Sequence, residues 1–248
     1  MYPGDVPKHI GIVAVSAEGA ALCYRTLCVE GAAVFGRHAH PEVTMHTYPL
    51  ADYMRHIEAG RWDEVSLMLL DSAEKLRRTG ARLLICPDNT AHQAIDLVRE
   101  QSPLPWLHIA EEVARVARER NFRRLLILGT KYLMEGPVYP AKLRSRGIEC
   151  DIPPPGERGR INGAIFDELV YGRFEDSTRA YFRDVIAAGK QRGAEAAVLA
   201  CTEIPLLIDD ADSALPTLDS TRILARAALR EAAREEAPRP GESIRQAE

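Results

Sequence analysis

An internal repeat of roughly 110 residues is the feature that most limits how this chain can fold. Three pairs of segments follow in the same order at nearly one spacing: GARLLICPDNT and GAEAAVLACTE from residues 80 and 193, LPWLHIAEEVAR and LPTLDSTRILAR from residues 104 and 215, and IGIVAVS and LLILGT, ending at Ser16 and Thr130. Short segments of this kind resemble one another by chance, but three ordered pairs favour a duplicated unit. We therefore predict two copies of one structural unit.

Within each copy, strand-like apolar runs alternate with helical patterns. The runs expected to form strands are 9–15, 42–48, 82–86, 105–109, 123–129, 147–152, 196–200 and 215–219. Helical patterns cover 55–79, 110–120, 160–171, 175–192 and 221–236. Such alternation is typical of parallel sheets with helices on both faces. The predicted fold class is therefore α/β, with two similar doubly wound parallel-sheet lobes related by a pseudo-two-fold axis.

The repeat also predicts where the lobes divide. We expect an N-terminal lobe over residues 1–110 and a C-terminal lobe over 111–220, with the helix 221–236 able to pack back on the first lobe. The last segment, 237–248, is rich in Pro, Gly and charged residues and poor in apolar ones. This composition is typical of a disordered tail.

Composition and charge exclude several classes of function. A net charge of −4 over 248 residues gives no electrostatic reason to expect nucleic acid or a membrane surface as a partner. No apolar run approaches the ~18–20 residues of a membrane span, and the N-terminus lacks the pattern of a signal peptide. We expect a cytoplasmic protein.

Cysteines and histidines give little sign of a disulfide framework or a metal site. The five cysteines are widely spaced and form no C-x-x-C motif, so disulfides are not expected in a reducing compartment. His38, His40 and His46 have no acidic or thiol ligand at a familiar spacing. We expect no metal.

Reactive residues occupy equivalent ends of the predicted strands. The repeat aligns Asp88 with Cys201, and it aligns Ser16 with Thr130. Ligands of open α/β sheets bind at the carboxyl ends of the strands. If the lobes face each other, Asp88 and Cys201 lie on opposite sides of one substrate. Two proton-transfer groups on opposite faces of one carbon are what a two-base racemase or epimerase requires.

Four motifs together resemble those of the cofactor-independent aspartate/glutamate racemase family over roughly residues 8–230. They are NTAH after a strand, LLILGT followed by LMEG, YPAKLRSRGIE, and ACTEIPLLI. The resemblance implies an active site between two α/β lobes, no pyridoxal phosphate or other cofactor, and a homodimer. It also implies two cysteines, one from each lobe, which remove and return the Cα proton.

The sequence departs from the family pattern at two informative positions. The first catalytic cysteine of the family directly precedes Asn-Thr, but here that position is Asp88, and Cys86 lies two residues earlier. The Gly-Thr loop of the family carries a second threonine before its methionine, whereas this chain has Leu133. Because that loop helps to hold substrate carboxylates in the family, the substrate could differ from aspartate or glutamate.

Cys201 and Asp88 are the predicted catalytic pair. We expect Thr202 near the N-cap of a helix, whose positive end would lower the pKa of the Cys201 thiol from about 8.5. Asp88 could cap a helix or act as the second acid/base, because burial would raise its pKa from about 3.9. Cys86 is the alternative, although the repeat places it opposite Leu199, an apolar core position.

The remaining predicted site residues supply hydrogen-bonding groups at strand ends. Glu203 would orient Cys201 or bind a substrate amine. Hydroxyl, amide and backbone N–H groups would bind a substrate carboxylate and stabilise an enediolate; they belong to Ser16, Asn89, Thr90, Thr130 and Thr202.

These observations predict an isomerase that racemises or epimerises an amino acid, aspartate or glutamate being the expected substrates, by two-base Cα proton transfer. One alternative is a decarboxylase or isomerase of the same superfamily, acting on a small dicarboxylate with Cys201 as its one protonating group. A second alternative is a carboxylate-binding protein without catalysis.

Overall fold

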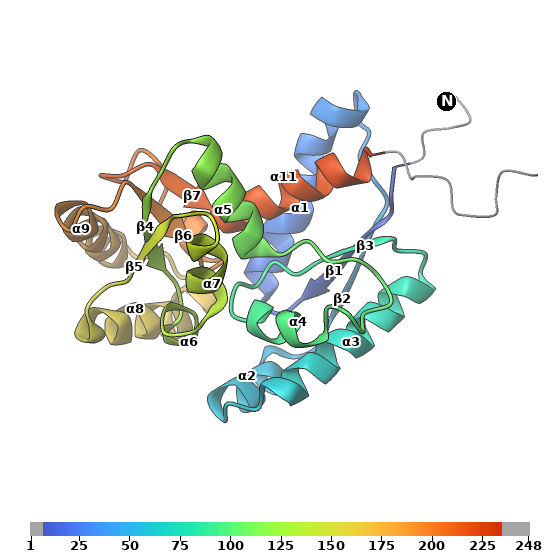
Figure 1. The fold of residues 1–248 in the computed structure, drawn as a ribbon, viewed down its shortest axis with the longest axis horizontal. Helices are drawn as coiled ribbons and strands as arrows, with labels where there is room; N and C mark the ends of the chain where they lie inside the picture. The colour runs from blue at the N-terminus through green and yellow to red at the C-terminus, as the bar shows by residue number, and fades with distance from the viewer. Residues whose placement is uncertain (1–6, 235–248) are drawn as a thin grey trace, which may run out of the picture.

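The computed structural model describes residues 7–234, which form two parallel sheets in two lobes (Figure 1). The first sheet has the strand order β2-β1-β3, and the second has the order β5-β4-β6-β7. All strand pairs are parallel. The two-lobed parallel α/β architecture predicted from the repeat is confirmed. The predicted tail 237–248 lies outside the described residues.

Apolar side chains on both faces of the central strand bury the first sheet between helices. Ile10 and Ile12 of β1 pack with α1 and α11, whereas Val13 and Val15 pack with α2, α3 and α4. Alternation along a strand sends successive side chains to opposite faces, so one strand supplies two cores. The elements are β1 (Ile10–Ala14), α1 (Ala17–Phe35), β2 (Val43–Thr47), α2 (Leu50–Glu58), α3 (Trp62–Arg78), β3 (Leu83–Ile85) and α4 (His92–Val98).

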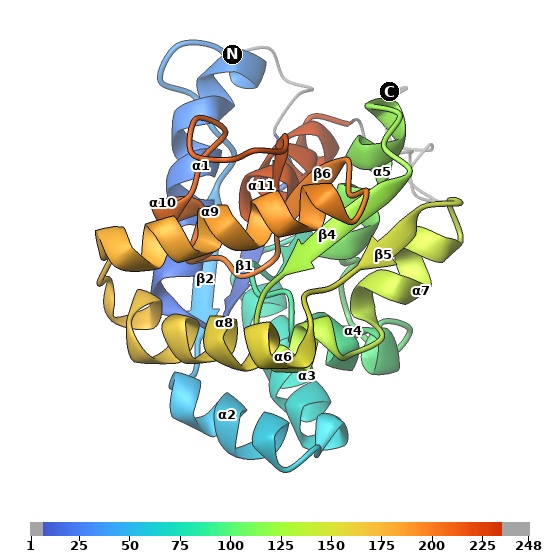
Figure 2. The ribbon, with the colours of Figure 1, turned by 90° about the vertical axis from the view of Figure 1, so that its left-hand side faces the viewer.

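The second lobe repeats this arrangement. Leu126 and Leu128 of β4 pack with α8 and α9 on one face, and Leu125 and Ile127 pack with α5 and α7 on the other. Figure 2 shows α8 and α9 in front of this sheet. The elements are α5 (Ile109–Glu119), β4 (Arg124–Leu128), α6 (Lys131–Met134), α7 (Val138–Arg144), β5 (Glu149–Asp151), α8 (Pro155–Asp167), α9 (Asp176–Gln191), β6 (Ala196–Leu199), α10 (Ile204–Leu207) and β7 (Thr217–Asp219).

The last helix, α11 (Ser220–Ala232), leaves β7 of the second lobe and packs against both α1 and α5. In Figure 1 it runs from the second lobe to the first. We propose lobe boundaries near residues 110 and 220, because the first sheet lies entirely before the first position and the second sheet lies between the two.

The structure contradicts two of the predicted elements. The segment 105–109 is not a strand but an isolated bridge between Leu84 and Trp106, since Pro105 has no N–H to donate and α5 begins at Ile109. The single helix expected over 55–79 is two helices, α2 and α3. Gly60, with φ of 67°, turns the chain between them.

Other helix boundaries differ less. The pattern over 160–171 is α8 followed by a 3-10 turn at Leu169–Tyr171. Helix α11 ends at Ala232, short of residue 236. Helix α1 is the longest element that the pattern of apolar residues did not reveal.

Candidate active site

A cavity between the two lobes collects the polar residues that follow four strands. Its empty volume is about 410 Å³, including space at the mouth. Most of the predicted site residues line it: Ser16 after β1, Asp88 and Thr90 after β3, Thr130 after β4, and Cys201 and Glu203 after β6. Apolar residues form the rest of the wall. Asn89 and Thr202 lie behind the lining.

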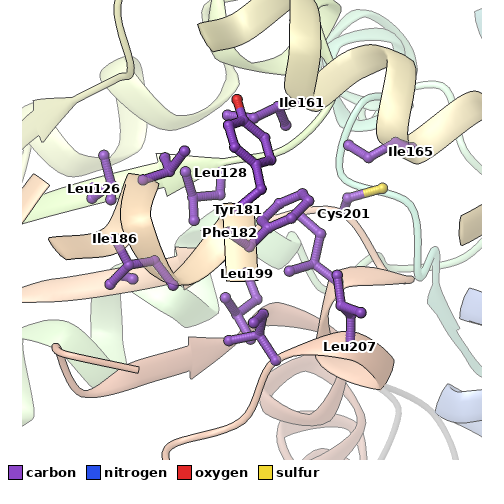
Figure 3. Packing of buried hydrophobic residues seen from close by; sticks show 14 of the residues in the cluster. Leu126, Leu128, Ile161, Ile165, Tyr181, Phe182, Ile186, Leu199, Cys201 and Leu207 are labelled. Atoms are coloured by element: carbon purple, nitrogen blue, oxygen red, sulfur yellow. The ribbon is translucent and has the colours of Figure 1, made fainter. Parts of the chain in front are cut away.

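Cys201 is held by a neighbouring carboxylate. Its Sγ donates to Glu203 Oε2 over 2.9 Å, and Thr202 Oγ1 donates to the same oxygen over 3.1 Å. Glu203 is 2% exposed, and its Oε1 has no hydrogen-bond partner among the described residues. Figure 3 shows Cys201 at the edge of the apolar cluster of the second lobe, its sulfur on the side of Ile165. Glu203 lines the cavity, so it brings there a buried carboxylate with one unpartnered oxygen.

The predicted lowering of the Cys201 pKa is wrong. Burial, and then the negative charge of Glu203, raise the pKa of the thiol well above its ordinary value. The helix that was expected to lower it, α10, is one turn long and has Glu203 rather than Thr202 at its N-cap position. At neutral pH Cys201 is therefore a thiol, which makes it an acid that is ready to donate a proton.

Asp88 caps a turn and also lines the cavity. Its Oδ1 accepts a hydrogen bond of 2.8 Å from the Ala91 N–H, which caps the turn before α4, and the side chain also lines the cavity. Burial, opposed by the Ala91 hydrogen bond and helped by the charge of Glu203, raises the pKa of Asp88 to about 6. A carboxylate with this pKa is a much better base than a free aspartate.

Cys86 lies in the core rather than at the cavity. It is 0% exposed and packs with Val13 and Leu84 in an apolar cluster of the first lobe. Leu199, which the repeat aligns with it, is buried in the same way in the second lobe. Burial also raises the pKa of the Cys86 thiol well above its ordinary value. The geometry favours Asp88 as the cavity group of the first lobe.

Two hydroxyl pairs join the lobes at the cavity. Ser16 Oγ lies 3.3 Å from Thr202 Oγ1, and Thr90 Oγ1 lies 3.0 Å from Thr130 Oγ1. Ser16 and Thr130 are also N-caps, since each accepts a backbone N–H from the first turn of its helix. The capping fixes the positions of these hydroxyls relative to Asp88 and Cys201.

Asn89 is turned away from the cavity. Its Nδ2 donates to Ser220 Oγ over 3.0 Å, its Oδ1 accepts from Tyr139 OH over 2.7 Å, and Ser220 Oγ donates to the Leu199 carbonyl over 2.8 Å. The Asn89 side chain thus ties the Asp88 loop to the second lobe instead of facing a ligand. Sequence reasoning missed Tyr139 and Ser220 as partners of Asn89, although Tyr139 begins the YPAKLRSRGIE motif and Ser220 lies in the repeated segment LPTLDSTRILAR.

Two kinds of feature are absent from residues 7–234. No cluster of three or more His, Cys, Asp or Glu side chains in this part of the chain could hold a metal ion. The same residues include no helix of the length and apolar character that crossing a membrane requires.

A cavity between two α/β lobes, lined by a carboxylate and a thiol from equivalent strand ends, is typical of an enzyme that transfers protons. The family model for Asp/Glu/Hydantoin racemase matches residues 12–228. The chain belongs to this family, which confirms the predicted family and makes it a racemase, an enzyme of the isomerase class.

Individual relatives agree with this assignment. The chain is 26% identical over 167 residues to the broad specificity amino-acid racemase RacX of Bacillus subtilis (strain 168), covering 67% of this chain and 72% of that protein. Among solved structures, a candidate Asp/Glu racemase from Yersinia pestis superposes with a TM-score of 0.83 at 28% identity, covering 92% of this chain and all 100% of that one. PH1733, an aspartate racemase homologue from Pyrococcus horikoshii OT3, gives a TM-score of 0.79 at 28% identity with the same coverage.

Proposed function

We propose that the protein is a cofactor-independent racemase or epimerase that inverts Cα of an amino acid by two-base proton transfer. The observation that carries the proposal is that Asp88 and Cys201 line one cavity from equivalent strand ends of the two lobes. They also interact electrostatically, since the charge of Asp88 contributes to the raised pKa of Cys201.

The expected protonation states support Asp88 as the group that acts first. With a pKa of about 6, Asp88 is ionised at pH 7 to 8, whereas the Cys201 pKa is well above its ordinary value. Asp88 takes the Cα proton, and the electron pair of the broken C–H bond moves into the α-carboxyl group as an enediolate. Cys201 then donates its proton to the opposite face of Cα. The enzyme returns to its starting form when a proton leaves Asp88 and another reaches Cys201.

The other lining groups would hold an amino-acid backbone. The hydroxyls of Ser16, Thr90 and Thr130 can donate to the α-carboxylate and to the enediolate. Glu203, with its unpartnered Oε1, can accept from the α-ammonium group. Pyridoxal phosphate is held in enzymes by a lysine amine, and no lysine occurs among the cavity-lining residues that the structure describes. This supports chemistry by the chain's own side chains.

Family membership alone supports the remaining proposals. It favours an acidic amino acid as substrate, a homodimer, and a cytoplasmic location. Light scattering of the purified protein tests the dimer.

Proton NMR in heavy water tests the mechanism. The wild-type enzyme should exchange the Cα proton of both enantiomers of its substrate. Asp88→Asn and Cys201→Ser should both lose racemisation, but each should still exchange the enantiomer whose Cα–H faces the remaining group. The two variants should therefore retain opposite enantiomers. If wild-type protein exchanges no amino acid in a broad panel, the proposal is wrong.

A matched pair of substitutions distinguishes the roles of Cys86 and Asp88. Asp88→Ala should abolish turnover, because it removes the base. Cys86→Ala should keep most of it, because that thiol is 0% exposed and does not line the cavity. The opposite pattern would move the catalytic role to Cys86.

Proton NMR in heavy water, together with binding measurements, also distinguishes the two alternative functions. A decarboxylase or dicarboxylate isomerase would place deuterium in its product and leave the unconsumed substrate unlabelled. A binding protein would show saturable binding without turnover, unchanged by Cys201→Ser.

A further inference from the structure

The cavity is lined by a polar set and an apolar set of residues. The polar residues all follow strands, as described above. The apolar set comes from both lobes: Leu50, Met54 and Ile57 of α2, Tyr132 of α6, Ile165 and Phe166 of α8, and Val170 of the 3-10 turn. If the polar residues bind the Cα substituents of a substrate, the apolar set is what remains to enclose its side chain.

The charges at the cavity are unfavourable to a second carboxylate. Among the described residues, none that lines the cavity is Lys, Arg or His, whereas Asp88 and Glu203 are both acidic. An ionised side chain that leaves water needs a partner of opposite charge or a full set of hydrogen bonds. The apolar set offers no charge and, apart from the Tyr132 hydroxyl, no hydrogen-bonding side-chain group, and the two acidic residues would repel an aspartate or glutamate side chain.

Four cations lie on elements that form the wall, but none of them lines the cavity. Lys131 Nζ lies 4.9 Å from the centre of the Tyr132 ring, and its side chain is exposed. Arg55 of α2 is paired with Asp52 at 2.8 Å. On α8, Arg158 is paired with Glu135 at 2.8 Å, and Arg160 lies 3.8 Å from the centre of the Tyr181 ring.

A difference from the family pattern agrees with this arrangement. Leu133 replaces the second threonine of the Gly-Thr loop, and it is 1% exposed, packed in the apolar cluster with Tyr139 and Leu143. The loop therefore offers Thr130 as a hydroxyl at the cavity but no second one at position 133.

Because much of the cavity lining is apolar and no cation is among the described lining residues, we infer that the substrate is a neutral α-amino acid with an apolar side chain. That side chain is aliphatic, thioether or aromatic. The inference rests on the proposed racemase function and replaces its family-based preference for aspartate or glutamate. Specificity then comes from Met54, Phe166 and their apolar neighbours on α2 and α8, which enclose the side chain without binding a charge.

Exchange of Cα–H for deuterium over a substrate panel tests the inference. Leucine, methionine and phenylalanine should exchange at least about 100-fold faster than aspartate, glutamate and lysine, since an unpartnered polar group at an apolar site is discriminated by factors of this order. Faster exchange of an acidic or a basic amino acid overturns the inference and leaves the racemase proposal standing. Exchange of no amino acid overturns the racemase proposal, and the inference with it.

A designed cation in the wall gives a second, independent readout. Met54→Arg should lower kcat/KM for leucine by about 10-fold or more and raise it for glutamate. The matched control is Ala59→Arg, which adds the same charge at the exposed end of α2, on the helix face opposite Met54, and should leave both values within about twofold. Equal effects of the two substitutions on both substrates would contradict the inference.

Lys131→Gln addresses the cation that lies beside the lining residue Tyr132. The apolar-substrate inference expects leucine turnover to stay within about twofold of wild type. If wild-type protein turns over glutamate efficiently and Lys131→Gln abolishes that turnover, Lys131 binds a side-chain carboxylate and the inference is wrong.

Discussion

Gly19 is the position where one added methyl group should disturb the whole site. It lies in the first turn of α1, and a Cβ at this residue would be 2.2 Å from Thr202 Oγ1, 2.5 Å from Thr202 Cβ and 3.0 Å from the Pro87 carbonyl. Thr202 directly follows Cys201, and Pro87 directly precedes Asp88. The Gly19 backbone is not in the left-handed region, so alanine is free to adopt it and the clash is the direct cost.

The size of the effect follows from these distances. Carbon atoms in contact lie about 3.5–4.0 Å apart, so Gly19→Ala must displace Thr202 from α1 by about 1 Å. A misplacement of about 1 Å costs catalysis roughly 100-fold, and overpacking costs about 1–3 kcal/mol of stability. In a protein of this size each kcal/mol lowers Tm by about 2–4 °C. We expect kcat/KM to fall by about 100-fold together with Tm.

The assay is the rate of racemisation by polarimetry, with thermal unfolding on the same samples. Gly159→Ala is the matched control, because it makes the same change in α8 at a position where a Cβ meets nothing within 4 Å. It should keep full activity and add about 0.5–1 kcal/mol of stability, the helix preference of alanine over glycine. If Gly19→Ala keeps wild-type activity and Tm, then the lobes do not meet at Gly19 and Thr202 as described.

Three further predictions concern the site. The kcat/KM should fall about tenfold per pH unit below pH 6, because Asp88 has its pKa raised to about 6 and must be ionised to act as a base; a pH profile that falls only near pH 4 contradicts this. Glu203→Gln removes a charge that raises the pKa of Cys201, so the pKa of the thiol should fall. Iodoacetamide should then alkylate Cys201 faster at pH 8. An unchanged alkylation rate would contradict the contact between Glu203 and Cys201. Tyr139→Phe leaves the buried Asn89 Oδ1 without its 2.7 Å hydrogen bond, which should cost about 1–3 kcal/mol in urea unfolding; wild-type stability would show that this bond contributes nothing.

The fold was largely predictable because its signals are local and repeated. Each central strand is a continuous apolar run, as buried parallel strands are, and the duplicated order fixed two lobes. Helix α1 was missed because its pattern is blurred. Tyr24 and Val29 are 48% and 61% exposed on a helix that also buries Leu22 and Leu27, so apolar residues occur on more than one face and the 3.6-residue period is weak.

Only the features of the site that follow from the positions of strand ends could be predicted from the sequence. Asp88 and Cys201 follow β3 and β6, so topology alone brings them to the same cavity. Asn89 also follows β3, but its orientation depends on Tyr139 and Ser220, which are 50 and 131 residues away. Contacts at such separations arise from the packing of the lobes and leave no pattern in the local sequence.

The pKa of Cys201 and the apolar wall could not be predicted from local sequence, for the same reason. Thiol acidity depends on burial and on which way Glu203 points, and both are tertiary properties. The wall joins α2 of one lobe to α8 of the other, and neither helix carries a motif.

The duplicated fold places chemically different groups, a carboxylate and a thiol, at equivalent positions. The thermodynamics of racemisation limits which kinetic constants this difference can affect. Two enantiomers have equal free energies, so the overall equilibrium constant is unity and kcat/KM must be the same in both directions. The low pKa of Asp88 relative to Cys201 keeps most of the free enzyme in the form that takes a proton with the carboxylate and gives one with the thiol. In the proposed mechanism, the enantiomer whose Cα–H faces Asp88 reacts with this abundant form, while its mirror image needs the rare form with a thiolate. The asymmetry must therefore appear in kcat and KM separately, in compensating amounts, and in the step that moves a proton from Asp88 back to Cys201 between turnovers.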